Sequence, residues 1–580
     1  MMGTISDKLM RVINTKEDIR KALISKGYDV PTSIPFKEYA KMISDLPCKV
    51  DDFPKLPGDV TRWHFGGLTN EMMAAMDDPR IEDADHKGRF LSFKNFAWKG
   101  MSGVGGYAGD FSKWRNNRDT TEIGITESNL KVIIDVKVSQ GAGKNIVFIS
   151  KSNLGISNNV TIKITSTYPE GVMKFSNSAS NKYLKLPSNG IITLQDNPEY
   201  TSNEMYLHLA SADLGQITIE QLPLYPGALV FDGVDDYGTC DNFPILTKEK
   251  GYTVVALRQW ITYNPNAISA IATNASDQSF NGAFTFENYN KGAEQTISYG
   301  ATQISLQYSK SPFSWQTTSK YNGVNIANGN KDATNSLVLG RSYPQRNDFA
   351  NFAIWELVFL DHDATEEELT KIKDYFVKTY PWLFFDQAWT VTGKTNEDED
   401  RATIANITGN GNDLVLSNFG FIEGSGYNEE GEYAGYLVTD GVDDSGRAVG
   451  LTISKDFTLV GEWILFSKTS VNAGLSIHPQ IHIFNRPEVI QIIFRTAGKT
   501  LPVKSLKAIC SDGRCYDENW SELKINVGEF TDNKGTLFVA SNGTNYAQIA
   551  FKNLGIYDNQ ILSKDDCIKA YNYLQTLKSK

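Results

Sequence analysis

The sequence of 580 residues carries a formal net charge of −11, with 41% hydrophobic and 22% charged residues. This length exceeds what one hydrophobic core supports and predicts about three to five domains. An acidic chain is not expected to bind nucleic acid as its main function, and no apolar run is long enough for a membrane-spanning helix. The composition is typical of a soluble globular protein.

The five cysteines are scattered and include no Cys-x-x-Cys pair, which argues against both a disulfide framework and a zinc site. The first residues lack the basic and then apolar run of a secretory signal. We therefore expect folding in a reducing cytoplasm and release by a route other than secretion, such as cell lysis.

The chain opens with short predicted helices within residues 1–50. Thr15 and Asp18 suit the cap of a helix that runs to about Lys26, and Pro35 suits the start of the next helix. So small a helical module buries too little apolar surface to be comfortably stable alone. We expect it to dock on another protein or to self-associate.

The sequence repeats itself with two different offsets. The Asp-Gly-Val-Asp-Asp run at Asp232 returns at Asp440, 208 residues later, whereas the segment that starts at Gly88 returns at Gly411, 323 residues later. The difference of 115 residues indicates an insertion in the first copy, at about 108–226.

The inserted segment has its own pattern. Val132 and Ile134 alternate with other residues, as do Ile217 and Ile219, and the stretches between them are rich in Gly, Asn and Ser. Such period-two alternation predicts antiparallel strands, so 108–226 is expected to form a β-sandwich domain.

The two repeat cores are expected at 227–385 and 434–580. Each holds many short β-type runs and ends in a capped helix, which predicts a sandwich of two sheets. The segments 51–107 and 386–433 are expected to be linkers and lead-ins to these cores.

The run from Leu229 to Tyr237 is similar to the opening of concanavalin A-like, laminin-G-type jelly-roll domains, and a late strand from Leu357 to Asp361 before a helix fits the same family. The second copy departs from it, with Ser445 in place of the aromatic residue. The resemblance implies a mainly β fold: tandem jelly-roll sandwiches, an inserted β domain and a small N-terminal helical anchor.

The stretch from Asn14 to Ile43 resembles the start of many phage structural and fibre proteins, and the whole layout looks like a fibre of the crAss-like phages. This resemblance implies a head or tail fibre component exposed on the virion, attached to other virion proteins through residues 1–50 and homo-oligomeric. A bacterial cell-surface glycan-binding protein is the alternative, and it would need an export signal.

Clustered aspartates in each repeat allow a calcium site, because carboxylates suit this hard cation. The residues are Asp232, Asp235 and Asp236 in the first copy and Asp440, Asp443 and Asp444 in the second. A tight turn, in which the aspartates bind backbone groups, is the interpretation that we favour. Laminin-G-type domains sometimes bind calcium, which keeps calcium as the alternative.

No catalytic pattern stands out in the sequence. The Glu-x-Asp-x-x-Glu strand of many concanavalin-like hydrolases is absent, Glu397–Asp400 is typical of a polar loop, and the six histidines lack metal-ligand spacing. We therefore expect no enzymatic activity, with a polysaccharide depolymerase as the less favoured alternative.

Host-surface or mucus glycans are the expected ligands, because lectins stack aromatic rings on sugar faces. Trp315 and Tyr321, in a polar loop, are the first candidates, and Trp520 is a weaker one. Packing in the core or on the surface is the alternative role for each ring.

Overall fold

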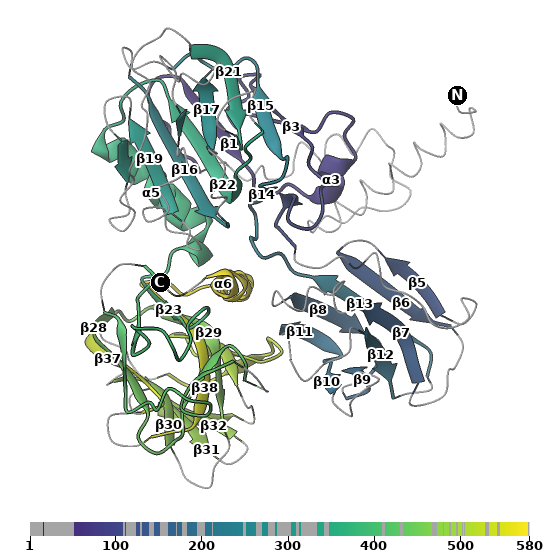
Figure 1. Ribbon diagram of the computed structural model, residues 1–580, viewed down its shortest axis with the longest axis vertical. Coiled ribbons are helices and arrows are strands. Elements are labelled where there is room, and N and C mark those ends of the chain that lie inside the picture. Colours follow the sequence, from purple (N-terminus) through teal and green to yellow (C-terminus); the bar gives the residue numbers. More distant parts are fainter. Residues whose placement is uncertain are drawn as a thin grey trace.

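The structure is a computed structural model of the chain, and it describes Lys16 and most of residues 52–579, with gaps of which 112–122, 287–302 and 315–332 are the longest. The predictions for residues 1–50 therefore fall outside the described residues, apart from Lys16. Within the described part the chain is mainly β, as predicted, and it forms three two-sheet units (Figure 1). No helix in this part is long and apolar enough to cross a membrane.

The first sandwich packs two antiparallel sheets around large aromatic side chains. One sheet has the order β20-β19-β16-β22-β14-β4, with β1 beside β22, and the other has the order β18-β17-β21-β15-β3-β2. The core between them includes Trp63, Phe93, Phe231 and Phe352. The strands are β1 (Val60–His64), β2 (Arg80–Glu82), β3 (Phe90–Lys94), β4 (Gly103–Val104), β14 (Leu229–Asp232), β15 (Tyr237–Cys240), β16 (Thr253–Trp260), β17 (Ala272–Ala275), β18 (Thr285–Phe286), β19 (Gln303–Tyr308), β20 (Pro312–Ser314), β21 (Ala333–Leu339) and β22 (Asn351–Leu360).

The inserted domain is a smaller sandwich that leaves the first one after β4 and returns at β14. Its sheets have the orders β10-β9-β12-β7 and β11-β8-β13-β6-β5. Val132, Ile134, Ile217 and Ile219 all point into its core, as their alternation predicts. The strands are β5 (Ile123–Glu127), β6 (Lys131–Val136), β7 (Lys144–Ser150), β8 (Thr161–Ser166), β9 (Met173–Ser176), β10 (Tyr183–Lys185), β11 (Asn189–Thr193), β12 (Glu204–Leu209) and β13 (Gly215–Gln221).

The second sandwich has sheets of order β26-β27-β38-β29-β34-β35-β36, with β23 beside β38, and β24-β25-β28-β37-β30-β31-β32-β33. The strands are β23 (Gln387–Thr390), β24 (Thr403–Ile404), β25 (Leu414–Ser417), β26 (Gly426–Asn428), β27 (Tyr436–Val438), β28 (Ser445–Ile453), β29 (Phe457–Leu465), β30 (Asn472–His478), β31 (Ile481–Arg486), β32 (Val489–Phe494), β33 (Ala497–Leu501), β34 (Leu506–Cys510), β35 (Arg514–Asp517), β36 (Glu522–Lys524), β37 (Asn533–Val539) and β38 (Ile549–Asp558).

The two large sandwiches share one topology. The order β14-β22-β16 corresponds to β27-β38-β29, and in both copies the pairing of the two long strands shifts register near its middle, at Leu257 and at Glu462. Each copy then ends in a helix with a hydroxyl N-cap: α5 (Glu366–Thr379) after Thr365 and α6 (Lys564–Thr576) after Ser563. The repetition in the sequence is therefore a repetition of the fold.

The segments 51–107 and 386–433, expected as linkers and lead-ins, belong to the sandwiches themselves. The first supplies β1 to β4 and the short helix α3 (Asn70–Ala74), and the second supplies β23 to β26. Strands β1 and β23 pair with the long strands β22 and β38, respectively. Each sandwich thus extends further towards its N-terminus than the repeat cores at 227–385 and 434–580.

Helix α6 lies where the three units meet (Figure 1). One hydrophobic cluster includes Phe376 of α5, Tyr571 and Leu574 of α6, and Ile191 of the inserted domain, together with the 3-10 helix at Pro381–Leu383. This shared cluster places the inserted domain against the second sandwich.

Candidate functional site

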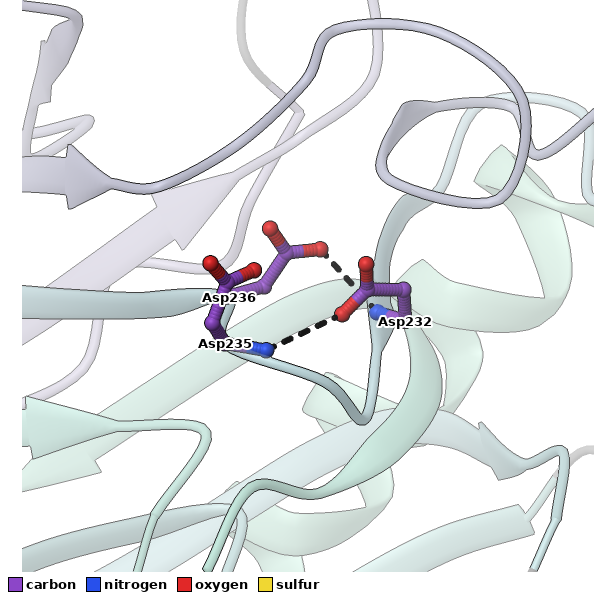
Figure 2. A group of neighbouring side chains, drawn as sticks. All are labelled: Asp232, Asp235 and Asp236. Carbon is purple, nitrogen blue, oxygen red and sulfur yellow. Dashed lines mark hydrogen bonds between the residues drawn. The ribbon is translucent and has the colours of Figure 1, made fainter. Parts of the chain in front are cut away.

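The first aspartate cluster forms a hydrogen-bonded turn between β14 and β15 (Figure 2). Asp232 Oδ1 accepts hydrogen bonds from the backbone N–H groups of Val234, at 2.8 Å, and Asp235, at 3.4 Å. Asp236 Oδ2 accepts from the N–H of Asp232 at 3.0 Å, and its Oδ1 accepts from the hydroxyl of Ser102 at 2.9 Å.

The second cluster repeats these contacts. Asp440 Oδ1 accepts from the N–H of Val442 at 2.7 Å, and Asp444 Oδ2 accepts from the N–H of Asp440 at 2.9 Å. Ser425 donates to Asp444 at 3.1 Å, as Ser102 does to Asp236. These are the turn contacts that the sequence analysis favoured for both copies.

In each cluster the three carboxylates place oxygen atoms within 4.8 Å of one another. Burial raises the pKa of Asp236 to about 7 and also raises the pKa of Asp444. Calcium needs six or more oxygen ligands, and the buried aspartate oxygens here already accept hydrogen bonds from the protein. Calcium binding at Asp232, Asp235, Asp440 and Asp443 stays the alternative to a metal-free turn.

Of the three predicted glycan-binding aromatic residues, Trp315 and Tyr321 lie outside the described residues. The Trp520 side chain is only 2% exposed, and its ring contacts those of Tyr516 and Tyr571 at centroid distances of 6.0 and 5.6 Å. This ring therefore packs inside the protein, which is the alternative role that we considered for it.

A cavity of about 590 Å³ lies at the meeting point of the inserted domain, the second sandwich and α6. We call it the junction cavity. Trp520 forms part of its wall. The other lining residues come from β8 and β11 (Lys163, Ile164, Thr165, Asn189, Gly190, Ile191), from the return connection (Leu222, Pro223, Pro226), from the turn after β35 (Asn519, Ser521) and from one face of α6 (Lys564, Asp565, Ile568, Lys569, Asn572).

The wall that the second sandwich contributes is a turn fixed by Asp517. Its Oδ1 accepts hydrogen bonds from the N–H groups of Asn519, at 2.9 Å, and Ser521, at 2.7 Å. Gly190 of the inserted domain comes so close that a Cβ there would lie 3.2 Å from the carbonyl oxygen of Asn519. The cavity is thus held by direct contact between two domains far apart in the sequence.

This cavity could not be predicted from the sequence because no single motif builds it. Its lining combines residues near 165, 190, 222, 520 and 568. The only signal in the sequence was Trp520, which was proposed for its residue type alone. Its neighbours Lys564, Lys569 and Asn572 follow the spacing of one helix face, but nothing in the sequence shows what that face meets.

Two buried clusters of charged residues were also missed. In the first sandwich, Glu356 accepts hydrogen bonds from Tyr375 at 3.1 Å and Tyr380 at 3.0 Å and pairs with Arg62. In the second, Glu462 pairs with Lys507 at 3.2 Å. The Glu356 side chain is fully buried, and its cluster joins β1, β22 and α5.

No protein-family model matches the chain, and no curated protein matches it significantly. Among solved structures, it is similar to a Trypanosoma rangeli sialidase in complex with sialic acid, with 9% identity, a TM-score of 0.23, and coverage of 89% of this chain and 98% of that one. A complex of that organism's sialidase with the inhibitor DANA has 9% identity and a TM-score of 0.22, and the match covers 85% of this chain and 67% of that one. An HCR/D mutant has 8% identity and a TM-score of 0.20, with coverage of 58% of this chain and 89% of that one.

These solved structures correct one expectation from the sequence. We expected no enzymatic activity, but the solved structures to which the chain is similar include sialidases, which are enzymes. The exclusion of an enzyme on sequence grounds therefore no longer stands. TM-scores near 0.2 are too low to give this chain the activity of those proteins.

Fold and site together define the class of the protein. It is a multi-domain β-sandwich protein with a duplicated large sandwich, an inserted small one, and a cavity where the inserted domain meets the second copy.

Proposed function

We propose that this chain binds a carbohydrate in the junction cavity and displays that site on the surface of a phage particle. The observation that carries the first part is the cavity itself. Its volume of about 590 Å³ lies in the range of about 300–1,000 Å³ that is usual for small-molecule sites.

The lining of the cavity offers both kinds of contact that a sugar needs. Asn189 and Asn519 carry amides that can donate to and accept from hydroxyl groups, and Ser521 adds a hydroxyl of its own. Leu222 and Ile568 provide apolar surface for the C–H face of a sugar ring. This combination suits a polyhydroxylated ligand better than a wholly apolar one.

The virion part of the proposal rests on the resemblance of the stretch from Asn14 to Ile43 to phage fibre proteins. In that proposal, residues 1–50 bind other virion proteins, and copies of the chain assemble into a homo-oligomer. The first sandwich then serves as a spacer between residues 1–50 and the cavity, whose wall the second sandwich helps to form.

A glycan array probed with the full chain tests the carbohydrate proposal. Thr165 is exposed and lines the cavity, so Thr165→Trp should fill it and abolish the binding of each glycan that the unaltered chain retains. Thr452→Trp, at an exposed position on β28, is the matched control and should bind as the unaltered chain does. Equal binding by Thr165→Trp and Thr452→Trp, or no binding of any glycan by the unaltered chain, would contradict the proposal.

A further inference from the structure

The wall of the junction cavity is basic although the chain is acidic. The whole chain has a formal net charge of −11. Among the described lining residues, by contrast, there are three lysines, Lys163, Lys564 and Lys569, against one carboxylate, Asp565. A cavity lined by one sign of charge raises the local concentration of ligands of the opposite sign.

Two of these lysines make no ion pair with any described residue. They are Lys163 on β8 and Lys564 at the start of α6, and both are exposed. Lys569 differs, because its ammonium group lies 3.2 Å from Asp566 and 4.1 Å from the ring centroid of Trp382. The positive charge that a ligand would meet therefore comes mainly from Lys163 and Lys564, on opposite sides of the domain junction.

The same wall contains a buried polar group without a partner. The Asn572 side chain is only 3% exposed and lines the cavity, and its Oδ1 accepts no hydrogen bond from the described residues. Buried amide oxygens are nearly always paired, so an unpaired one next to a cavity indicates a place for a donor. This oxygen is itself closed to solvent, so a ligand hydroxyl group can supply the donor once the Asn572 side chain turns towards the cavity.

We infer that the junction cavity is specific for acidic sugars, which carry a carboxylate on a hydroxylated ring. This inference rests on the proposed carbohydrate binding and adds its chemical class. The carboxylate would face Lys163 and Lys564, and a ring hydroxyl would donate to Asn572. The apolar surface of Ile568 and Leu222 would contact the ring between these polar groups.

Calorimetric titration of the full chain with a panel of uronic acid oligosaccharides and their methyl esters tests this class. The panel comprises oligogalacturonate, oligoguluronate and a hyaluronan tetrasaccharide. Esterification removes the charge and keeps the ring and its length, so at least one acid should bind about tenfold or more tightly than its ester. Raising the salt concentration should lower the affinity for the acid and leave the affinity for the ester almost unchanged.

Variants locate the effect in the cavity. The double substitution Lys163→Gln with Lys564→Gln should remove the difference in affinity between the acid and its ester. Lys137→Gln, at an exposed lysine of the inserted domain outside the lining, is the matched control. All of these positions are exposed, so the variants should fold, which circular dichroism checks.

The possible results separate the two proposals. Esters that bind as tightly as their acids would overturn the acidic class and leave carbohydrate binding intact. Glycans that bind in the array but are never acidic would have the same meaning. Inorganic sulfate that binds as tightly as the acids, and competes with them, would show a general anion site and overturn the sugar. If no glycan binds in the array or the titrations, the proposed function itself fails.

Discussion

Arg62 Nη1 lies 3.4 Å from Glu356 Oε2, and both side chains are almost completely buried where Tyr375 of α5 closes over them. The pair connects β1, in the segment expected to be a linker, with the long strand β22. It therefore shows that residues 51–107 are part of the structure of the first sandwich.

Replacing Glu356 with Leu should destabilise the first sandwich by about 3–5 kcal/mol, because Arg62 would be left as a buried charge without its carboxylate. Urea denaturation followed by tryptophan fluorescence measures this loss. The double variant Arg62→Met, Glu356→Leu is the control and should lose clearly less stability, since it removes both charges. A single variant within about 1 kcal/mol of the unaltered chain would show that the pair is unimportant.

The second sandwich should lose stability in acid because of Glu462. Burial by itself would raise the pKa of this carboxyl, but Lys507 and Lys552 outweigh burial and bring the pKa down to about 2. In the unfolded chain a glutamate titrates near pH 4.3. A lowered pKa in the folded state stabilises above the unfolded value, and that stabilisation is lost as the pH falls from about 5 towards 2.

Calorimetric melting at pH 7 and pH 3 tests this prediction. At pH 7 the variant Glu462→Gln should lose on the order of 2–3 kcal/mol in its free energy of unfolding, because it leaves Lys507 and Lys552 without a carboxylate. It should therefore melt at a lower temperature than the unaltered chain. The difference between the two melting temperatures should be smaller at pH 3. A gap of constant size between the two pH values would mean that Glu462 does not titrate as stated.

The aspartate turns should hold their shape without metal. Asp236→Ala removes the acceptor for the N–H of Asp232 and for the Ser102 hydroxyl, and should cost about 1–3 kcal/mol because a buried donor is left unpaired. Asp235→Ala is the control, because its exposed carboxylate is not part of these bonds. Millimolar calcium should leave the melting temperature of the unaltered chain unchanged. A rise of several degrees in that temperature, lost in the variant Asp440→Asn, would instead establish a calcium site in the second copy.

Removing residues 1–50 should leave the sandwiches folded but prevent incorporation of the chain into particles. The expected result is a truncated protein that melts normally and binds glycans as before, yet is missing from purified virions by immunoblotting. A truncated protein found on particles at the normal level would rule out residues 1–50 as the anchor.

The repeats in the sequence predicted the main features of the fold because they preserve the turns that fix each strand pair. Gly233 and Gly441 illustrate this, since both adopt a φ of +76° in the same Asp-Gly-Val-Asp-Asp turn, a conformation that glycine adopts without strain. The limits of the sandwiches were harder to predict. Strands such as β4 and β24 have only two residues, too few for an alternating pattern, and gain stability from their neighbours.

The candidate site was mostly beyond prediction for a different reason. Whether Trp520 packs inside or binds a ligand depends on Tyr571, which lies 51 residues further along the chain and meets it only in the folded protein. The approach of Gly190 to Asn519 crosses an even longer span. Patterns within one strand or helix carry no information about such contacts between domains.

Hydrogen exchange of the full chain, with and without a glycan selected from the array, tests carbohydrate binding in the junction cavity most directly. Our account predicts slower exchange in three stretches together: 186–192 of the inserted domain, 517–523 of the second sandwich and the first turns of α6. Slower exchange confined to other parts of the chain, such as 309–323 with Trp315 and Tyr321, would contradict the assignment of the site to this cavity.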